Sequence, residues 1–339
     1  MNQVTVVKNN RSVLSANIRE IGLILVIILI SILVQFRSGG SFLTGENINN
    51  ILVETAVLAI LSVGMMMVII TGGIDLSIGA TMALSGMVGT TVLKNNPGMN
   101  PIIIIFIAIA VGTVCGLIVG FLVARLNILP IIATLGMMNV YRGVTYLVSN
   151  GGWVLQKDMT KEFMGIATGG FLGINNLVWI AIFVYCIGYY FMNYCRKGRQ
   201  IYAVGNSMES ARVSGIKTKN VLVLVYTLMG LIAGLAGILY VCKYAASQGE
   251  TATGYEMNVI AACVLGGVSI SGGVGKVQGV LLGALLFGLL NNALPLMHVS
   301  PFLQEGLKGL IILLSIMLNA MIHRRVTRKS LERRNESEQ

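Results

Sequence analysis

Residues 102–124 read IIIIFIAIAVGTVCGLIVGFLVA, a run of 23 residues without a charged side chain. A helix needs about 20 apolar residues to cross the hydrocarbon core of a bilayer, where it pairs its own backbone groups. The run therefore predicts a membrane-spanning helix. The whole chain of 339 residues has the same character, since 55% are hydrophobic, 11% are charged, and the mean hydropathy is +0.82. This composition excludes an ordinary soluble domain.

Ten apolar runs of this kind follow one another along the chain. They are 21–36, 55–71, 76–93, 102–124, 128–148, 171–195, 221–242, 258–275, 276–295 and 303–322. We therefore expect an all-α integral membrane protein of about ten transmembrane helices. The separations at 71–76 and 275–276 are the weakest, because glycines and a few polar residues alone divide the runs there. A broken or re-entrant segment at either place lowers the count to eight or nine.

The distribution of Lys and Arg residues predicts which loops lie on the cytoplasmic side of the membrane. With the N-terminus in the cytoplasm and ten alternating spans, 17 of the 24 Lys and Arg residues fall on the cytoplasmic side and six outside, while Lys308 lies within the last span. Cytoplasmic loops of membrane proteins carry such an excess. We expect a cytoplasmic segment at 1–20, a membrane domain at 21–322 with a cytoplasmic loop at 196–220, and a basic cytoplasmic tail at 323–339. This topology explains the net charge of +11 without any nucleic acid.

The first candidate site is the stretch TGGIDLSIGA at 71–80. A carboxylate beside a membrane span is costly unless solvent, backbone or a cation satisfies it, and paired glycines let the backbone bend to do so. Gly72, Gly73, Asp75 and Ser77 therefore either line a solute pathway, or Asp75 caps a helix that starts near Leu76.

Three amides in apolar spans form a second group of candidates. Asn291 and Asn292 lie late in the ninth run, and Asn139 lies in the fifth. Buried amides bind hydroxylated solutes or lock neighbouring helices together. We assign these three residues to the pathway and keep helix locking as the alternative. The sequence also contains an internal echo, by which we mean the two similar stretches TGGI at 71–74 and SGGV at 271–274.

The third candidate is the cytoplasmic stretch 198–216. Ser207 is placed as an N-cap and Gly215 as the end of a short helix. Such a helix, too short to be stable alone, fits a groove on a partner protein or serves as a plain connector. The residues that we assign to coupling are Gly205, Asn206, Glu209, Ala211, Arg212 and Gly215.

The absence of certain sequence motifs argues against several classes of function. The glycine-rich stretch 266–276 lacks the spacing of a phosphate-binding loop, since Ile270 stands where a glycine is needed and Val277 follows Lys276. We find no catalytic or metal-binding pattern, so we expect a transport protein rather than an enzyme, with no cofactor in this chain. Acidic residues are rare in the apolar runs, which argues against the alternative of an ion-coupled secondary transporter.

Four stretches together resemble a known family, the permeases of bacterial ABC importers for ribose and related monosaccharides. They are TGGIDLSIGA at 71–80, IYAVGNSMESARVSGI at 201–216, GYEMNVIAACVLGGVSISGGVGKVQGVLLGALL at 254–286, and NNALPLMHVSPFLQEGLKGLIIL at 291–313. They occur in the family's order and span nearly the whole chain.

The resemblance implies a permease fold of ten helices in the bacterial inner membrane, working with a second copy or a similar permease. It implies a cytosolic ATPase that carries ATP and magnesium, and an external sugar-binding protein. Residues 205–216 would be the coupling helix that docks on the ATPase, and Asp75 would border the pathway. Ribose, another pentose, rhamnose and an autoinducer-2-like furanose all fit as the solute.

Overall fold

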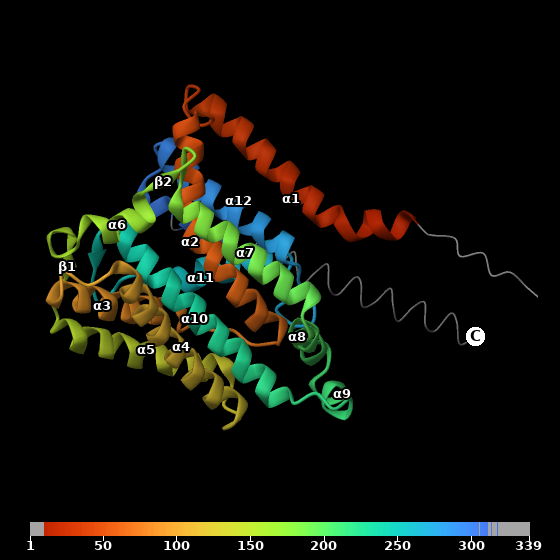
Figure 1. Ribbon diagram of the computed structural model, residues 1–339. Helices are drawn as coiled ribbons and strands as arrows, with labels where there is room; N and C mark the ends of the chain where they lie inside the picture. Colours follow the sequence, from red (N-terminus) through yellow and green to blue (C-terminus); the bar gives the residue numbers. More distant parts are fainter. Residues whose placement is uncertain (1–9, 305, 311–312, 314–316, 318–339) are drawn as a thin grey trace, which may run out of the picture.

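The computed structural model of the chain describes residues 10–304, 306–310, 313 and 317. These residues form a bundle of helices with two small two-stranded sheets at one end (Figure 1). The helices are α1 (Asn10–Arg37), α2 (Gly45–Ile70), α3 (Ile78–Asn95), α4 (Pro101–Ala124), α5 (Pro130–Ser149), α6 (Lys161–Thr168), α7 (Asn176–Tyr194), α8 (Arg196–Asn206), α9 (Met208–Val213), α10 (Thr218–Tyr244), α11 (Tyr255–Leu265) and α12 (Val277–Leu296). Strand β1 (Val154–Leu155) pairs antiparallel with β4 (Ala246–Ser247), and β2 (Gly170–Phe171) with β3 (Ile174–Asn175).

The expected all-α membrane architecture is confirmed. Within the described residues, seven helices are long and apolar enough to cross a membrane, namely α1 from Glu20 onward, α2, α4, α5, α7, α10 and α12. The expected third run is the 18-residue helix α3. The eighth run, 258–275, is only partly helical, because α11 ends at Leu265 and a glycine-rich turn follows. The tenth run, 303–322, lies largely outside the described residues.

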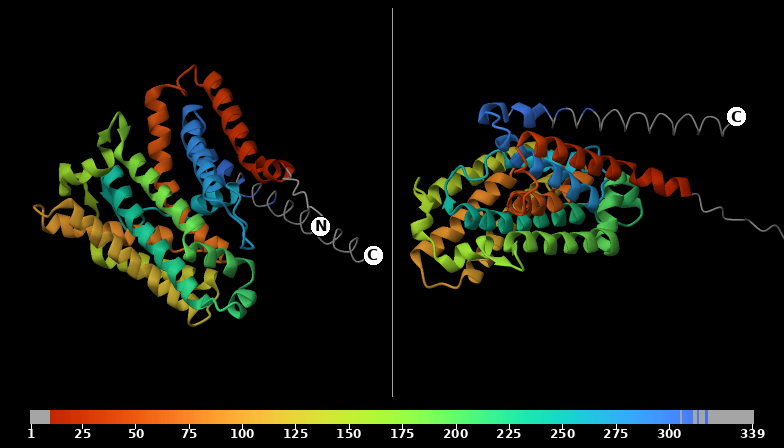
Figure 2. Two further views of the ribbon diagram at one scale, coloured as in Figure 1. Left: turned by 45° about the vertical axis from the view of Figure 1, so that its right-hand side comes forward. Right: turned by 90° about the horizontal axis from the view of Figure 1, so that it is seen from above.

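The bundle has two distinct ends. We call the end with β1 to β4 and α6 the strand end, and the opposite end, with α8 and α9, the α9 end; both are visible in Figures 1 and 2. Lys276 forms an ion pair with Glu20 at 2.7 Å, which ties the start of α12 to α1. At the α9 end Arg125 donates to Asn220 at 2.7 Å, which joins the end of α4 to the start of α10. The basic loop 196–220 therefore lies at one end of the bundle, as the expected topology requires.

Helices α4 and α10 pack with their backbones in direct contact. A Cβ atom added at Gly116 lies 2.8 Å from the Gly230 Cα atom, and one at Gly112 lies 2.6 Å from the Gly234 Cα atom. Small residues allow this approach in membrane bundles, where dispersion rather than the hydrophobic effect holds helices together. Two glycines on each helix thus set the α4–α10 distance.

Gly116→Ala should destabilise the bundle by about 1–3 kcal/mol, because the new methyl group overlaps the backbone of α10 and forces the helices apart. Thermal unfolding of the detergent-solubilised chain measures the effect. Gly136→Ala on α5 is the matched control, since the space around Gly136 is open and its stability should not fall. Equal melting temperatures for the two variants contradict this packing account.

Candidate functional site

The chain leaves helical geometry directly after α2. Gly72 has φ of +80°, its N–H donates to the Ile69 carbonyl at 2.9 Å, and the Gly73 N–H donates to the Val68 carbonyl at 3.1 Å. This pair of bonds is a Schellman motif, which satisfies the last carbonyls of a helix and needs a left-handed residue. The glycines predicted to bend this segment therefore end α2 and start the non-helical stretch 71–77.

Asp75 lies in the middle of this stretch and is 2% exposed. Its Oδ1 atom accepts hydrogen bonds from the Ser77 N–H at 2.8 Å and the Ser77 hydroxyl at 2.6 Å. Ser77 is the N-cap of α3, which begins at Ile78 rather than near Leu76 as expected. The carboxylate thus fixes the start of α3, and its role beside a pathway stays a prediction.

The second glycine turn contacts the first. The Gly273 N–H donates to the Ile70 carbonyl at 2.9 Å. Gly272 and Gly273 have φ of +86° and +75°, so both occupy the region that favours glycine. The two halves of the TGGI and SGGV echo are therefore joined in the structure by a backbone hydrogen bond.

The end of α8 packs on both turns. A Cβ atom at Gly205 would overlap the Ile70 carbonyl and lie 2.8 Å from the Gly273 nitrogen, so only glycine fits there. The Asn206 Cα atom lies 3.3 Å from a Cβ atom placed on Gly273. The Tyr202 hydroxyl donates to the Gly275 carbonyl at 2.8 Å. We call the three segments 70–73, 205–206 and 271–275 the glycine node.

Helix α9 follows the node and is exposed. Its N-cap Ser207 accepts from the Ser210 N–H at 3.2 Å, and Gly215, with φ of +81°, ends it, as the sequence predicted. Glu209 and Arg212 form an ion pair at 3.0 Å on side chains that are 73% and 71% exposed. Of its residues only Ala211 is buried. Of the predicted coupling residues, Gly205 and Asn206 thus belong to the node, while Glu209, Ala211 and Arg212 form the helix.

The predicted pathway residues do not form one cluster. Asn292 exchanges two hydrogen bonds of 3.0 Å with Asn47 at the strand end of α2, which is the helix-locking contact. Gly72 follows the other end of this 26-residue helix, about 40 Å away. The buried Asn291 Oδ1 atom has no partner among the described residues. Asn139 lies exposed on α5 and donates to the Leu135 carbonyl at 3.0 Å.

A re-entrant segment, 246–254, was missed by the sequence analysis. After β4 the chain runs along α3 toward its start, since the Ser247 hydroxyl contacts the Met87 sulfur at 3.8 Å and the Ala252 carbonyl lies 2.6 Å from a Cβ atom placed on Gly79. Arg142 donates to the carbonyls of Gly249 at 2.8 Å and Thr251 at 2.7 Å. The polar, glycine-containing stretch 247–254 between two apolar runs is the sequence feature that indicates this segment.

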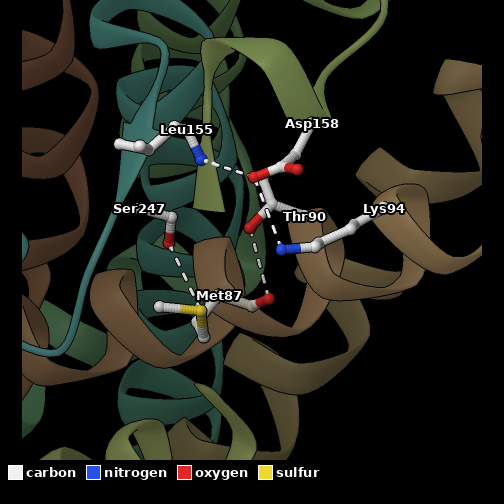
Figure 3. Close-up of polar contacts among 6 residues, drawn as sticks. All are labelled: Met87, Thr90, Lys94, Leu155, Asp158 and Ser247. Carbon is white, nitrogen blue, oxygen red and sulfur yellow. Dashed lines mark hydrogen bonds and ion pairs between the residues drawn. The ribbon is translucent and has the colours of Figure 1, made fainter. Parts of the chain in front are cut away.

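The strand end anchors this segment (Figure 3). Asp158 accepts from the Leu155 N–H at 3.2 Å and pairs with Lys94 of α3 at 3.4 Å. Because Leu155 lies in β1, which pairs with β4, the carboxylate ties the start of the re-entrant segment to α3. The hydrogen bond from the Leu155 amide, followed by the charge of Lys94, lowers the pKa of Asp158 below its ordinary value.

A carboxylate with a lowered pKa stabilises the folded arrangement above its ordinary pKa, and this contribution is lost as the pH falls through the lowered value. In a Trp179→Phe chain, the fluorescence of Trp153 should therefore change with a midpoint below the ordinary Asp value. Asp158→Asn should remove this transition. The same titration in both chains contradicts the anchoring role.

Residues 47–316 match the family model described as branched-chain amino acid transport system / permease component. The chain belongs to this permease family. It is 39% identical over 300 residues to the ribose import permease protein RbsC of Escherichia coli K12, covering 87% of this chain and 92% of that protein. No solved structure matches the chain.

Two further relatives are similar over most of their length. The L-arabinose ABC transporter permease protein AraH of Azospirillum brasilense is 33% identical over 291 residues, covering 86% of this chain and 84% of that protein. The galactose/methyl galactoside import permease protein MglC of Escherichia coli K12 is 31% identical over 325 residues, covering 91% and 96%. The permease is thus a transport subunit, as expected from the absence of catalytic patterns in its sequence and now supported by its relatives.

Proposed function

We propose that this permease forms the membrane pathway of an ATP-driven importer for a monosaccharide. The observation that carries the proposal is the set of relatives, whose names specify ribose, L-arabinose and galactose and which match the chain over nearly its whole length. Nothing favours the ion-coupled secondary transporter. ATP and magnesium belong to a separate ATPase, in line with the sequence, which has no phosphate-binding loop.

The ATPase docks on α9 in this proposal. The Glu209–Arg212 pair and the apolar side chains of Met208 and Val213, which are 47% and 81% exposed, give the helix a mixed polar and apolar face. Two basic cavities of about 260 and 440 Å³ adjoin it. Their basic lining residues are Arg125, Arg196, Lys197, Arg212, Lys217 and Lys219. Such a surface suits an acidic groove on a cytosolic partner.

The glycine node transmits the movement of α9 to the pathway. Because Gly205 touches both glycine turns and Asn206 touches the second, a shift of α8 and α9 displaces the segment before α3 and the segment before α12 together. ATP binding and hydrolysis on the partner then bias the permease between outward- and inward-open states. Gly72, Gly73, Asp75 and Ser77 border the pathway at the first turn, while Asn139, Asn291 and Asn292 belong to its walls.

The two ends of the bundle indicate where the remaining partners bind. An external sugar-binding protein delivers the solute at the strand end, and a second copy or a similar permease completes the membrane unit. The protein lies in the bacterial inner membrane, and in this proposal both termini are cytoplasmic. The common position of the basic loop 196–220 and the start of the membrane-spanning part of α1 at the α9 end supports this for the N-terminal side.

Charge reversal of Arg212 on α9 should weaken ATPase binding about tenfold or more, because the new carboxylate then faces the acidic groove of the partner. Co-purification from gently solubilised membranes measures it for Arg212→Glu, and the double exchange Glu209→Arg with Arg212→Glu, which keeps an ion pair and the net charge of the helix, should recover part of the binding. Lys161→Glu on α6 at the strand end is the control and should bind as the wild type does. Unchanged ATPase recovery with Arg212→Glu contradicts docking on α9.

A further inference from the structure

A cavity at the strand end is lined by aromatic and uncharged polar side chains. It lies between the end of α10 and the re-entrant segment and has a volume of about 280 Å³. We propose that it is a subsite for a neutral monosaccharide on its way into the bundle, an inference that rests on the proposed function. Its principal lining residues are Tyr240, Tyr244, Gln248, Glu250, Thr253 and Tyr255.

Three tyrosine rings form one wall. The ring centroids of Tyr240 and Tyr244 lie 4.5 Å apart, and those of Tyr240 and Tyr255 lie 5.8 Å apart in an edge-to-face arrangement. An aromatic ring offers an apolar face beside a polar hydroxyl, which suits the mixed C–H and O–H surface of a sugar. The aromatic wall therefore matches a monosaccharide better than a purely apolar or a purely ionic ligand.

Several hydrogen-bonding groups of the cavity are not used by the fold. In the described part of the chain, no hydrogen bond is formed by the hydroxyls of Tyr240 and Tyr255 or by the side-chain amide of Gln248. The Tyr244 hydroxyl, in contrast, is engaged with Glu54 at 3.3 Å. Hydroxyls and amides both donate and accept, as the hydroxyls of a sugar do. These three groups are available for a polyhydroxylated ligand.

The charges around the cavity favour a neutral ligand over an anionic one. The nearby ammonium group of Lys243 is neutralised by Glu54 at 2.7 Å and lies 4.7 Å from the centre of the Tyr244 ring. Glu250 adds a carboxylate to the lining. Arg142 is the other nearby cation among the described residues, and its guanidinium is engaged with the carbonyls of Gly249 and Thr251. A phosphorylated or acidic sugar therefore meets the Glu250 carboxylate while both nearby cations already have partners, whereas a neutral sugar meets no such penalty.

The cavity is connected to both the pathway and the glycine node. Tyr255 begins α11, and Glu256 in its first turn lies 2.6 Å from a Cβ atom placed on Gly79, next to the stretch that holds Asp75. The other end of α11 leads through Gly266 to the turn 271–275 in the node. This helix of 11 residues, about 16 Å long, thus links the ligand cavity to the segment that α8 displaces.

Cysteine protection tests the subsite directly. In a chain with Cys186→Ser and Cys195→Ser, which leaves only buried native cysteines, Thr253→Cys is reacted with a maleimide in the presence of D-ribose, L-arabinose or D-galactose, and of glycine betaine at equal osmolality. At a sugar concentration of about twice the Kd, mass action should slow labelling about threefold, whereas betaine should not. Asn150→Cys, exposed outside the cavity at the same end, should label at one rate throughout. Equal rates with all sugars and betaine at Thr253→Cys overturn the subsite.

Transport by the complete importer supplies the second measurement. Gln248→Ala and Tyr255→Phe should each reduce sugar uptake about fivefold, the effect of one lost hydrogen bond, while stimulation of ATP hydrolysis by the binding protein persists. Tyr189→Phe on the outer surface of α7 is the control. Wild-type uptake in both variants overturns the subsite but leaves the importer intact. Absence of uptake of any sugar by the wild type overturns the proposed function itself.

Discussion

Backbone polar groups inside a membrane bundle need partners within the protein, and this constraint explains the contacts of the described non-helical segments that lie within the bundle. The Ile70 carbonyl receives the Gly273 N–H, and the Gly275 carbonyl receives the Tyr202 hydroxyl. The carbonyls of Gly249 and Thr251 share the guanidinium of Arg142. Each break in a helix is therefore stabilised by a neighbouring element, so the breaks are bound to one another rather than independent.

The glycines let these segments approach so closely that one segment cannot move without displacing the other. At Gly205 a single added carbon overlaps the Ile70 carbonyl, and at Gly112 and Gly116 it overlaps the backbone of α10. Closely packed backbones do not deform continuously but change between discrete arrangements. A shift of α8 therefore moves the whole node. The cavity at the strand end and the exposed α9 are thus connected through α11 and the glycine turns.

The sequence predicted those features that depend on local chemistry. Apolar run length identified the seven long helices, Ser207 and Gly215 bounded α9, and the glycine pairs marked both turns. It did not predict α8 as a helix or the re-entrant segment 246–254. The run 258–275 was apolar enough to suggest a full span, whereas its helix ends at Leu265 because Gly266 packs against Gly279 and the chain turns there. Contacts between distant segments, such as Asn47 with Asn292, leave no local pattern.

Hydrogen exchange of the assembled importer tests the central claim most directly, that α9 moves both glycine turns together. Backbone amide exchange is compared between the ATP-bound and nucleotide-free complexes for the segments 70–77, 207–216 and 268–276. The account predicts that protection of the two turns, including the Gly273 amide, changes in parallel with that of α9. A change confined to 207–216, with both turns unaffected, would contradict it.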